Sequence, residues 1–310
     1  MITHMNNKTL HICYITDVMY LQYTVASIYS IIRRKDPDTT IQFYVIGDRL
    51  QNKQFDIINK FNSVDNISVT CVAADTIRLL GVGVPHLLKM LIPDFDIFKP
   101  LHKLLYIDGD QFARKDVSTV YHTDLDGYSI GMVKDAGGVI CKGISEWPQP
   151  NYFHKDFYYN TGLILMDLDK MRENKVHHKW IDYLKTHGVY SPFDQPAINY
   201  TNHYDCKTLP LSYQLSYHNL IRYPDMHVHK VEKWNQYYGT NYASIKEMVD
   251  ASYFWHFHEK KAEMTQQFPL IARIFSLLFS DYDKFAQTGI VQPWEPKDDA
   301  LFYINPDTME

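Results

Sequence analysis

Two aspartates separated by one glycine, Asp108-Gly109-Asp110, are the residues of this sequence best suited to chemistry. They directly follow the apolar run at residues 104–107, which is typical of a buried strand, so both carboxylates should stand where the chain leaves a sheet. Gly109 permits the tight bend that lets two carboxylates reach one hard cation. Because Asp-Gly is also a common hairpin turn, the pair alone leaves both a metal site and a plain turn open.

The first half of the chain alternates strand and helix signals around this pair. Apolar runs at 12–15, 41–46 and 67–72 indicate strands, and helical spacing of apolar residues indicates helices at 21–32 and 51–61. This order predicts a parallel sheet with helices on both faces.

Further elements follow in the second half of the chain. Asn160-Thr161-Gly162 opens another apolar run, and Asp167 is expected to begin one helix that reaches about Leu184. Residues 253–255 should form a strand. An amphipathic helix at 268–285 could pack on the core, on a second subunit or on a membrane surface, and core packing is favoured.

Polar side chains gather at the expected strand ends. In open α/β sheets, ligands bind outside the carboxyl ends of the strands. We expect five residues to follow such ends and to converge on one crevice: Asp17, Asp108, Asp110, Asp135 and Asn160.

Composition narrows the class of protein. The 310 residues are 45% apolar, enough for a sizeable core in one or two domains, and a net charge of −5 gives no general attraction for nucleic acid. The four cysteines lack C-x-x-C spacing and are expected to be reduced and structural. Because there is neither an apolar leader nor a window of about eighteen apolar residues, a cytoplasmic location is the default expectation.

Taken in order, the motifs resemble those of glycosyltransferase family 8, the retaining UDP-sugar transferases. The resemblance covers roughly residues 10–262 and rests on these segments: 15–20, 89–94, 103–110, 158–168, 191–199 and 255–257. It implies a GT-A-type, Rossmann-like mixed α/β sheet flanked by helices. It further implies a nucleotide-sugar-binding catalytic domain at residues 1–265 and a helical extension at 266–310.

The resemblance also implies a reaction and its participants. A hexose, galactose or glucose, would pass from a UDP-hexose donor to a saccharide or glycolipid acceptor, with Mn²⁺ as the cofactor and Mg²⁺ as an alternative. Such acceptors leave peripheral contact with the inner membrane face open. Neither the oligomeric state nor the sugar follows from the motifs.

Individual roles follow from the same resemblance. The implied metal ligands are Asp108, Asp110 and His256. The implied donor-binding residues are Ile15, Thr16, Asp17, Tyr20, Lys89, Asp108, Gly109, Asp110 and Lys261. The implied catalytic residues are Asp135 and Asn160, at the sugar hydroxyls, and Asp194 and Gln195, near the anomeric carbon.

Simpler alternatives stand beside these roles. The aspartates at 17, 135 and 194 could instead be helix or turn caps: Asp17, Asp135 and Asp194. His258 could be the metal ligand in place of His256. Lys260 could contact the diphosphate in place of Lys261.

The chain departs from the family pattern at several positions. Lys89 stands where the family has arginine and lacks its bidentate fork, Met19 replaces a frequent asparagine, and Pro196 replaces an aspartate. The family's late H-x-x-G-x-x-K-P-W element begins at His256 but lacks its glycine and its K-P-W. Binding of the diphosphate near residues 259–261 should therefore differ.

The mechanism expected from these residues is front-side transfer. The amide of Gln195 has no accessible anionic form and would be a poor nucleophile, so we expect a UDP oxygen to help deprotonate the acceptor. Other activities remain as alternatives: a UDP-sugar hydrolase, a nucleotidyltransferase or a non-catalytic nucleotide-sugar-binding protein.

Overall fold

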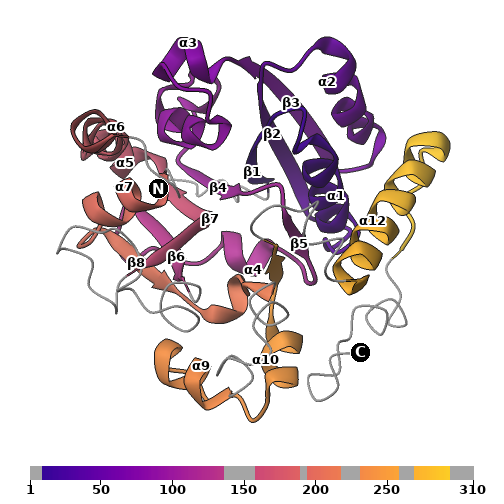
Figure 1. Cartoon of the computed structure of the whole chain (residues 1–310). Helices are drawn as coiled ribbons and strands as arrows, with labels where there is room; N and C mark the ends of the chain where they lie inside the picture. The colour runs from indigo at the N-terminus through magenta and orange to yellow at the C-terminus, as the bar shows by residue number, and fades with distance from the viewer. Residues whose placement is uncertain (1–8, 136–157, 189–193, 218–230, 258–268, 294–310) are drawn as a thin grey trace, which may run out of the picture.

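The computed structural model describes residues 9–135, 158–188, 194–217, 231–257 and 269–293 (Figure 1). A seven-stranded sheet with the order β3-β2-β1-β4-β7-β6-β8 runs through its centre. The strands are β1 (Thr9–Thr16), β2 (Thr40–Asp48), β3 (Ile67–Ala74), β4 (Lys103–Ile107), β6 (Ile130–Lys134), β7 (Tyr159–Asp167) and β8 (Cys206–Leu209). The expected mixed α/β sheet is confirmed.

Strand direction departs from the sequence prediction at one place. β1, β2, β3 and β4 run parallel to one another, as predicted, but β7 is antiparallel to both β4 and β6. Asn160 therefore lies at the start of β7, and the expectation that it follows a strand end is wrong. Because β7 is reversed, its first residues reach the same sheet edge as Asp108 after β4 and Asp135 after β6, so the residues still converge there.

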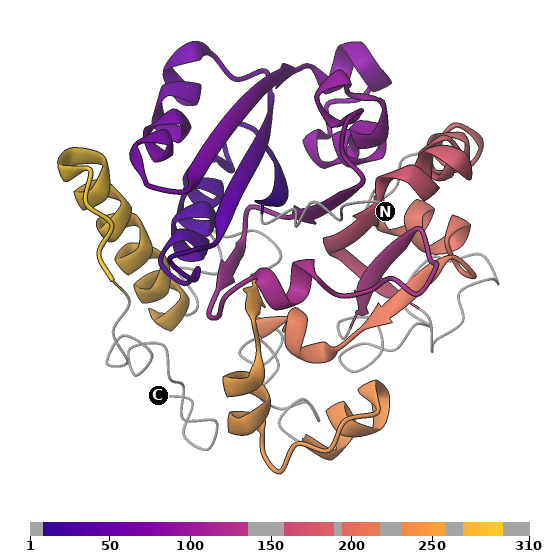
Figure 2. The same cartoon turned by 180° about the vertical axis from the view of Figure 1, so that it is seen from behind.

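Helices cover both faces of the sheet because alternate strand residues point to opposite sides (Figures 1 and 2). In β4, Leu105 and Ile107 face one side, whereas Leu104 and Tyr106 face the other. The first side is covered by α1 (Leu21–Ile32), α2 (Asn52–Asn59) and α4 (Ser118–Tyr121). The second is covered by the 3₁₀ segment η2 (Pro85–Asp94), α5 (Leu168–Glu173), α6 (Val176–His187) and α7 (Asp194–Thr201).

The single helix predicted from Asp167 to about Leu184 is two helices, α5 and α6. Asp167 caps α5 as expected, since its side chain accepts a hydrogen bond from the Lys170 N–H. The chain breaks at Lys175, whose φ of 51° lies in the left-handed region. Lysine gives no sequence signal for that conformation, which favours glycine or asparagine.

A smaller sheet lies beside the main one. It pairs β5 (Gln111–Ala113) with β9 (Phe254–His256) in antiparallel register. A separate apolar core contains residues of both strands and of α9 (Val231–Tyr238), α10 (Ile245–Ala251) and α12 (Pro269–Thr288). The short elements that complete the described chain are η1 (Lys60–Ser63), α3 (Thr76–Leu80), η3 (Asp96–Phe98) and η6 (Leu211–Tyr213).

The amphipathic helix expected near residues 268–285 is α12, which lies along α1 (Figure 1). Its Ile274, Phe275 and Leu278 are buried in the smaller core, and Tyr282 and Phe285 reach the main core. The favoured prediction, packing on the protein's own core, is therefore confirmed. Within the described parts of the chain, none of the helices is both long and apolar enough to cross a membrane.

Cysteines in the described chain are free, as predicted: Cys13, Cys71 and Cys206. Cys141 lies outside the described residues.

Gly109 is needed for a different reason than the bend inferred from sequence. Its φ is not in the left-handed region, so the turn does not itself demand glycine. Instead the backbone passes very close to α1. A Cβ added at Gly109 would lie 2.3 Å from Thr24 Oγ1 and 3.2 Å from Thr24 Cα. Close packing of the turn on α1 thus fixes where the two carboxylates stand.

We predict that Gly109→Ala destabilises the fold by about 1–3 kcal/mol, because the added methyl group overpacks a buried contact. Thermal unfolding measures the effect, and Gly83→Ala is the matched control because a Cβ there meets only Ile77 at 3.6 Å. Adding Thr24→Ala should recover part of the loss, since it removes the nearer clash. Equal stability of the two glycine variants would contradict this role for Gly109.

Candidate active site

The two aspartates and a distant histidine meet at the edge of the main sheet. His256 Nε2 lies 3.1 Å from Asp110 Oδ1 and 4.0 Å from Asp108 Oδ2, and one ligand atom from each residue falls within 4.8 Å of the others. The β5–β9 pairing causes this meeting, because Gln111, the residue after Asp110, is directly opposite His256. The structure thus places close together the three residues that the sequence resemblance implied as metal ligands.

The ring of His256 is held from two sides. Gln214 Nε2 lies 3.0 Å from His256 Nδ1 and also donates to Asn160 Oδ1 at 3.1 Å. A Cβ at Gly162 would lie 2.3 Å from His256 Cε1, so only glycine leaves room for the ring there. The buried Gln214 lies outside the motifs used above, and sequence reasoning missed it.

The donor set of this triad fits a divalent cation. Two carboxylates and one imidazole suit Mn²⁺ or Mg²⁺ with coordination positions left over, rather than a closed zinc site. Asp110 and His256 are buried, whereas the side chain of Asp108 keeps 29% of its surface exposed. A cation held here would therefore have one side open to an oxygen-bearing ligand.

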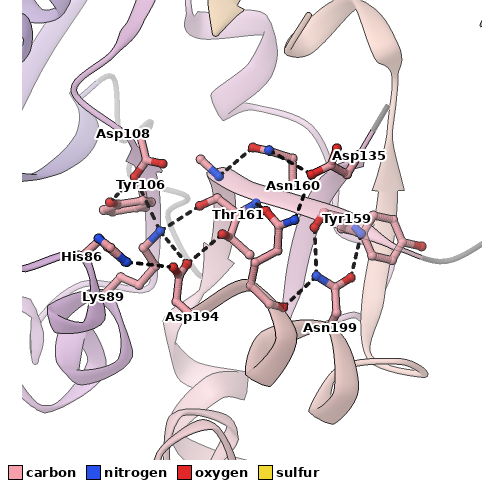
Figure 3. A network of polar contacts seen from close by, with 12 residues as sticks. His86, Lys89, Tyr106, Asp108, Asp135, Tyr159, Asn160, Thr161, Asp194 and Asn199 are labelled. Atoms are coloured by element: carbon pink, nitrogen blue, oxygen red, sulfur yellow. Dashed lines mark hydrogen bonds and ion pairs between the residues drawn. The ribbon is translucent and has the colours of Figure 1, made fainter. Parts of the chain in front are cut away.

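A buried ammonium group connects the triad to the neighbouring helix α7 (Figure 3). Lys89 Nζ lies 2.9 Å from Asp194 Oδ2 and 3.5 Å from Asp108 Oδ1, and it donates to the Thr161 carbonyl at 3.1 Å. It also lies 4.6 Å from the centre of the Tyr106 ring. Lys89 is thus placed by η2 between the two carboxylates.

The charges in this network stabilise one another. Burial by itself would lower the pKa of Lys89, but Asp108 and Asp194 raise that pKa above its ordinary value. Burial would raise the pKa of Asp194, but Lys89 and His86 hold it below its ordinary value. Lys89 and Asp194 are therefore both charged at neutral pH.

Tyr106 completes the surroundings of Asp108. Its hydroxyl donates a 2.5 Å hydrogen bond to Asp108 Oδ1, and burial raises its pKa well above the ordinary value, so it remains a donor. Sequence reasoning missed this role, although residues two apart on a strand share a face. His86, whose Nε2 lies 3.5 Å from Asp194 Oδ1, was missed as well and carries no comparable signal.

The predicted sugar-side residues also meet (Figure 3). Gln195 Nε2 donates to Asp135 Oδ2 at 2.8 Å, and Asn160 Nδ2 lies 3.3 Å from the same oxygen. The Thr161 N–H donates to Gln195 Oε1 at 3.3 Å, and the Thr161 hydroxyl donates to Asp194 Oδ2 at 2.7 Å. The amide plane of Gln195 is consequently fixed at both ends.

A third side chain of α7, that of Asn199, also ties this helix to the sheet. Asn199 accepts the Tyr159 N–H at 2.6 Å and donates to the Tyr159 carbonyl at 2.8 Å. This pair of bonds fixes the start of β7 against α7, and with it the positions of Asp194 and Gln195.

The predicted nucleotide-side residues lie at the end of β1, the neighbour of β4 in the sheet. Ile15 and Thr16 are buried, whereas Tyr20 is 41% exposed. Asp17 Oδ1 accepts the N–H groups of Met19 and Tyr20, both at 2.9 Å. Asp17 therefore caps the turn before α1, while the N-cap of α1 itself is Tyr20.

Three residues weighed from the sequence lie outside the described part of the chain: His258, Lys260 and Lys261.

Comparison with known proteins agrees with this geometry. The sequence model of the family described as Glycosyl transferase family 8 matches residues 11–260. Lipopolysaccharide 1,2-glucosyltransferase of Escherichia coli (strain K12) is 26% identical over 200 residues, which cover 62% of this chain and 58% of that protein. General stress protein A of Bacillus subtilis (strain 168) is 22% identical over 206 residues, covering 62% of this chain and 69% of that protein. The chain thus spans less than two thirds of the glucosyltransferase.

Solved structures share the fold. The galactosyltransferase LgtC in complex with donor and acceptor sugar analogues superimposes with a TM-score of 0.65 at 15% identity, covering 87% of this chain and 95% of that one. The bifunctional glycosyltransferase WbbM in its apo form also superimposes with a TM-score of 0.65, at 18% identity. The superposition covers 84% of this chain and 47% of that one. The expected GT-A-type fold is thereby confirmed. Since the family model spans most of the sequence, this chain belongs to glycosyltransferase family 8.

Proposed function

We propose that this protein is a cation-dependent retaining hexosyltransferase. It would move galactose or glucose from a UDP-sugar to a saccharide or glycolipid acceptor, with residues 1–265 as the catalytic domain and 266–310 as a helical extension. The observation that carries the proposal is the meeting of Asp108, Asp110 and His256 at one sheet edge, where Lys89 connects Asp108 to Asp194, the neighbour of Gln195 in the chain.

The triad would hold Mn²⁺, or Mg²⁺ in its place. Such a cation would neutralise the negative charge that develops on a diphosphate leaving group. Tyr106 and Lys89 each contact Asp108 and so orient its carboxylate toward the triad. Gln214 contacts Nδ1 of His256 and so orients its ring toward the triad.

The contacts of Asp194 support front-side transfer over a protein nucleophile. Asp194 is the carboxylate beside Gln195, but its oxygens are engaged by Lys89, His86 and the Thr161 hydroxyl. Its lowered pKa makes it a weak nucleophile. Gln195 offers an amide without an anionic form. Its fixed orientation suits a group that stabilises positive charge on the sugar without bonding to it.

Donor binding is tested by thermal unfolding with a panel of UDP-sugars, with and without Mn²⁺. The bound donor should stabilise the protein by about 2.7 kcal/mol at a hundredfold excess over Kd, and only when Mn²⁺ is present. Asp110→Asn should abolish the stabilisation by the donor that depends on Mn²⁺. Absence of stabilisation by every UDP ligand would refute the proposal.

The reaction type is tested by measuring UDP release with and without a saccharide acceptor. A transferase releases UDP faster when the acceptor is present. Release that is independent of the acceptor would instead identify a UDP-sugar hydrolase.

We predict that Gln195→Ala lowers kcat at least about 100-fold while leaving KM for the donor nearly unchanged, because the amide would act in the transition state. Steady-state kinetics with saturating Mn²⁺ measure both constants. Gln287→Ala, at an exposed position of helix α12, serves as a control for the same truncation. Full turnover by Gln195→Ala would exclude this role.

We predict that Lys89→Met lowers the free energy of unfolding by about 3–5 kcal/mol at neutral pH, because it leaves two carboxylates uncompensated. The pKa of Asp194 is depressed in the folded state, so its stabilising contribution is complete above the ordinary value of 3.8 and is lost as pH falls through the lower folded pKa. The pKa of Lys89 is raised, so its contribution is complete below 10.5 and is lost only as pH rises through the higher folded pKa.

The difference between wild type and Lys89→Met should therefore be constant across neutral pH and shrink in acid. Unfolding experiments from neutral pH into the acid range test this prediction. Lys89→Met combined with Asp194→Asn should recover part of the lost stability. A difference that does not change in acid would show that Lys89 stabilises the fold by packing instead of charge.

A further inference from the structure

A second group of possible metal ligands lies where η2 meets α6. Asp94 is the last residue of η2, and His177 and His178 belong to the first turn of α6. His177 Nε2 lies 3.0 Å from Asp94 Oδ1, and His178 Nε2 lies 3.9 Å from Asp94 Oδ2. One ligand atom from each of the three residues falls within 4.8 Å of the others. None of them belongs to the candidate active site.

These separations suit a small cation. With metal–nitrogen and metal–oxygen bonds of about 2.0–2.1 Å, the ligand atoms of a tetrahedral site stand about 3.3 Å apart. The distances from the Asp94 carboxylate to Nε2 of His177 and to Nε2 of His178, 3.0 and 3.9 Å, lie on either side of that separation. Small rotations of the half-exposed side chains of Asp94 and His178 would complete the geometry, while the buried His177 provides a fixed ligand.

The donor set differs from that of Asp108, Asp110 and His256. Two imidazoles and one carboxylate suit Zn²⁺, Ni²⁺ or Co²⁺, whereas two carboxylates and one imidazole suit Mn²⁺ or Mg²⁺. Exposure of Asp94 and His178 leaves a coordination position open to water.

We propose that Asp94, His177 and His178 form a second site, specific for a transition metal such as Zn²⁺, that cross-links η2 to α6. The site has a structural consequence for the active centre. Its segment η2 carries Lys89 and His86, and α6 is the helix that precedes α7 with Asp194. A cation bridging η2 and α6 would therefore brace η2, which carries Lys89, against the helix that packs on α7, which carries Asp194.

The test uses tag-free protein with Asp110→Asn, which disables the triad of Asp108, Asp110 and His256, and titrates it with Co²⁺. Tetrahedral Co²⁺ gives intense visible absorption bands, and we expect one equivalent to bind. Adding His178→Gln or Asp94→Asn should abolish these bands. Both side chains are about half exposed, so the variants should fold. His122→Gln changes an exposed histidine outside the group and should leave binding intact.

Thermal unfolding provides a second readout. Zn²⁺ should raise the Tm of the Asp110→Asn protein and fail to raise it once His178→Gln is added. Absence of Co²⁺ bands, or equal binding with and without His178→Gln, would overturn the proposal. Either result would mean that Asp94 and His177 form only a hydrogen bond at the start of α6.

Discussion

The buried ammonium of Lys89 is the group on which the arrangement of the site depends. It is the shared partner of Asp108, which follows β4, and Asp194, which begins α7. Taking such a charge out of water is costly unless it is paired, so the lysine and both carboxylates must be held together. An arginine would offer a planar fork of donors, whereas a lysine offers three N–H donors that can rotate. In Lys89 the ammonium group lies close to the two carboxylates and to the Thr161 carbonyl.

The second constraint is the pairing of two three-residue strands. β9 supplies only one ligand, yet its antiparallel register with β5 sets His256 opposite Gln111 and hence beside Asp110. The ring then fits against Gly162, where no side chain could be accommodated. The imidazole of His256, distant in the sequence from the two aspartates, is thus positioned by the backbone pairing of β5 with β9 and by the absence of a Cβ at Gly162.

Sequence alone predicted much of the fold and named residues that the structure brings together. Apolar runs marked β1, β2, β3, β4, β7 and β9, whereas no strand was predicted at β5 or β8. The ordered motifs named Asp108, Asp110 and His256, which the structure places close together. The reversal of β7 was missed because an apolar run carries no information on strand direction. The break at Lys175 was missed because a left-handed lysine has no signature. Gln214 and His86 were missed because their roles depend on distances between elements that no local pattern encodes.

We propose above that Asp108, Asp110 and His256 bind the catalytic cation. Electron paramagnetic resonance of Mn²⁺ titrated into the protein with UDP present tests it most directly, because free and bound Mn²⁺ give distinct signals. We expect one bound Mn²⁺ per chain in the wild type and none in Asp110→Asn at the same concentrations. Equal Mn²⁺ binding by the two proteins would contradict it.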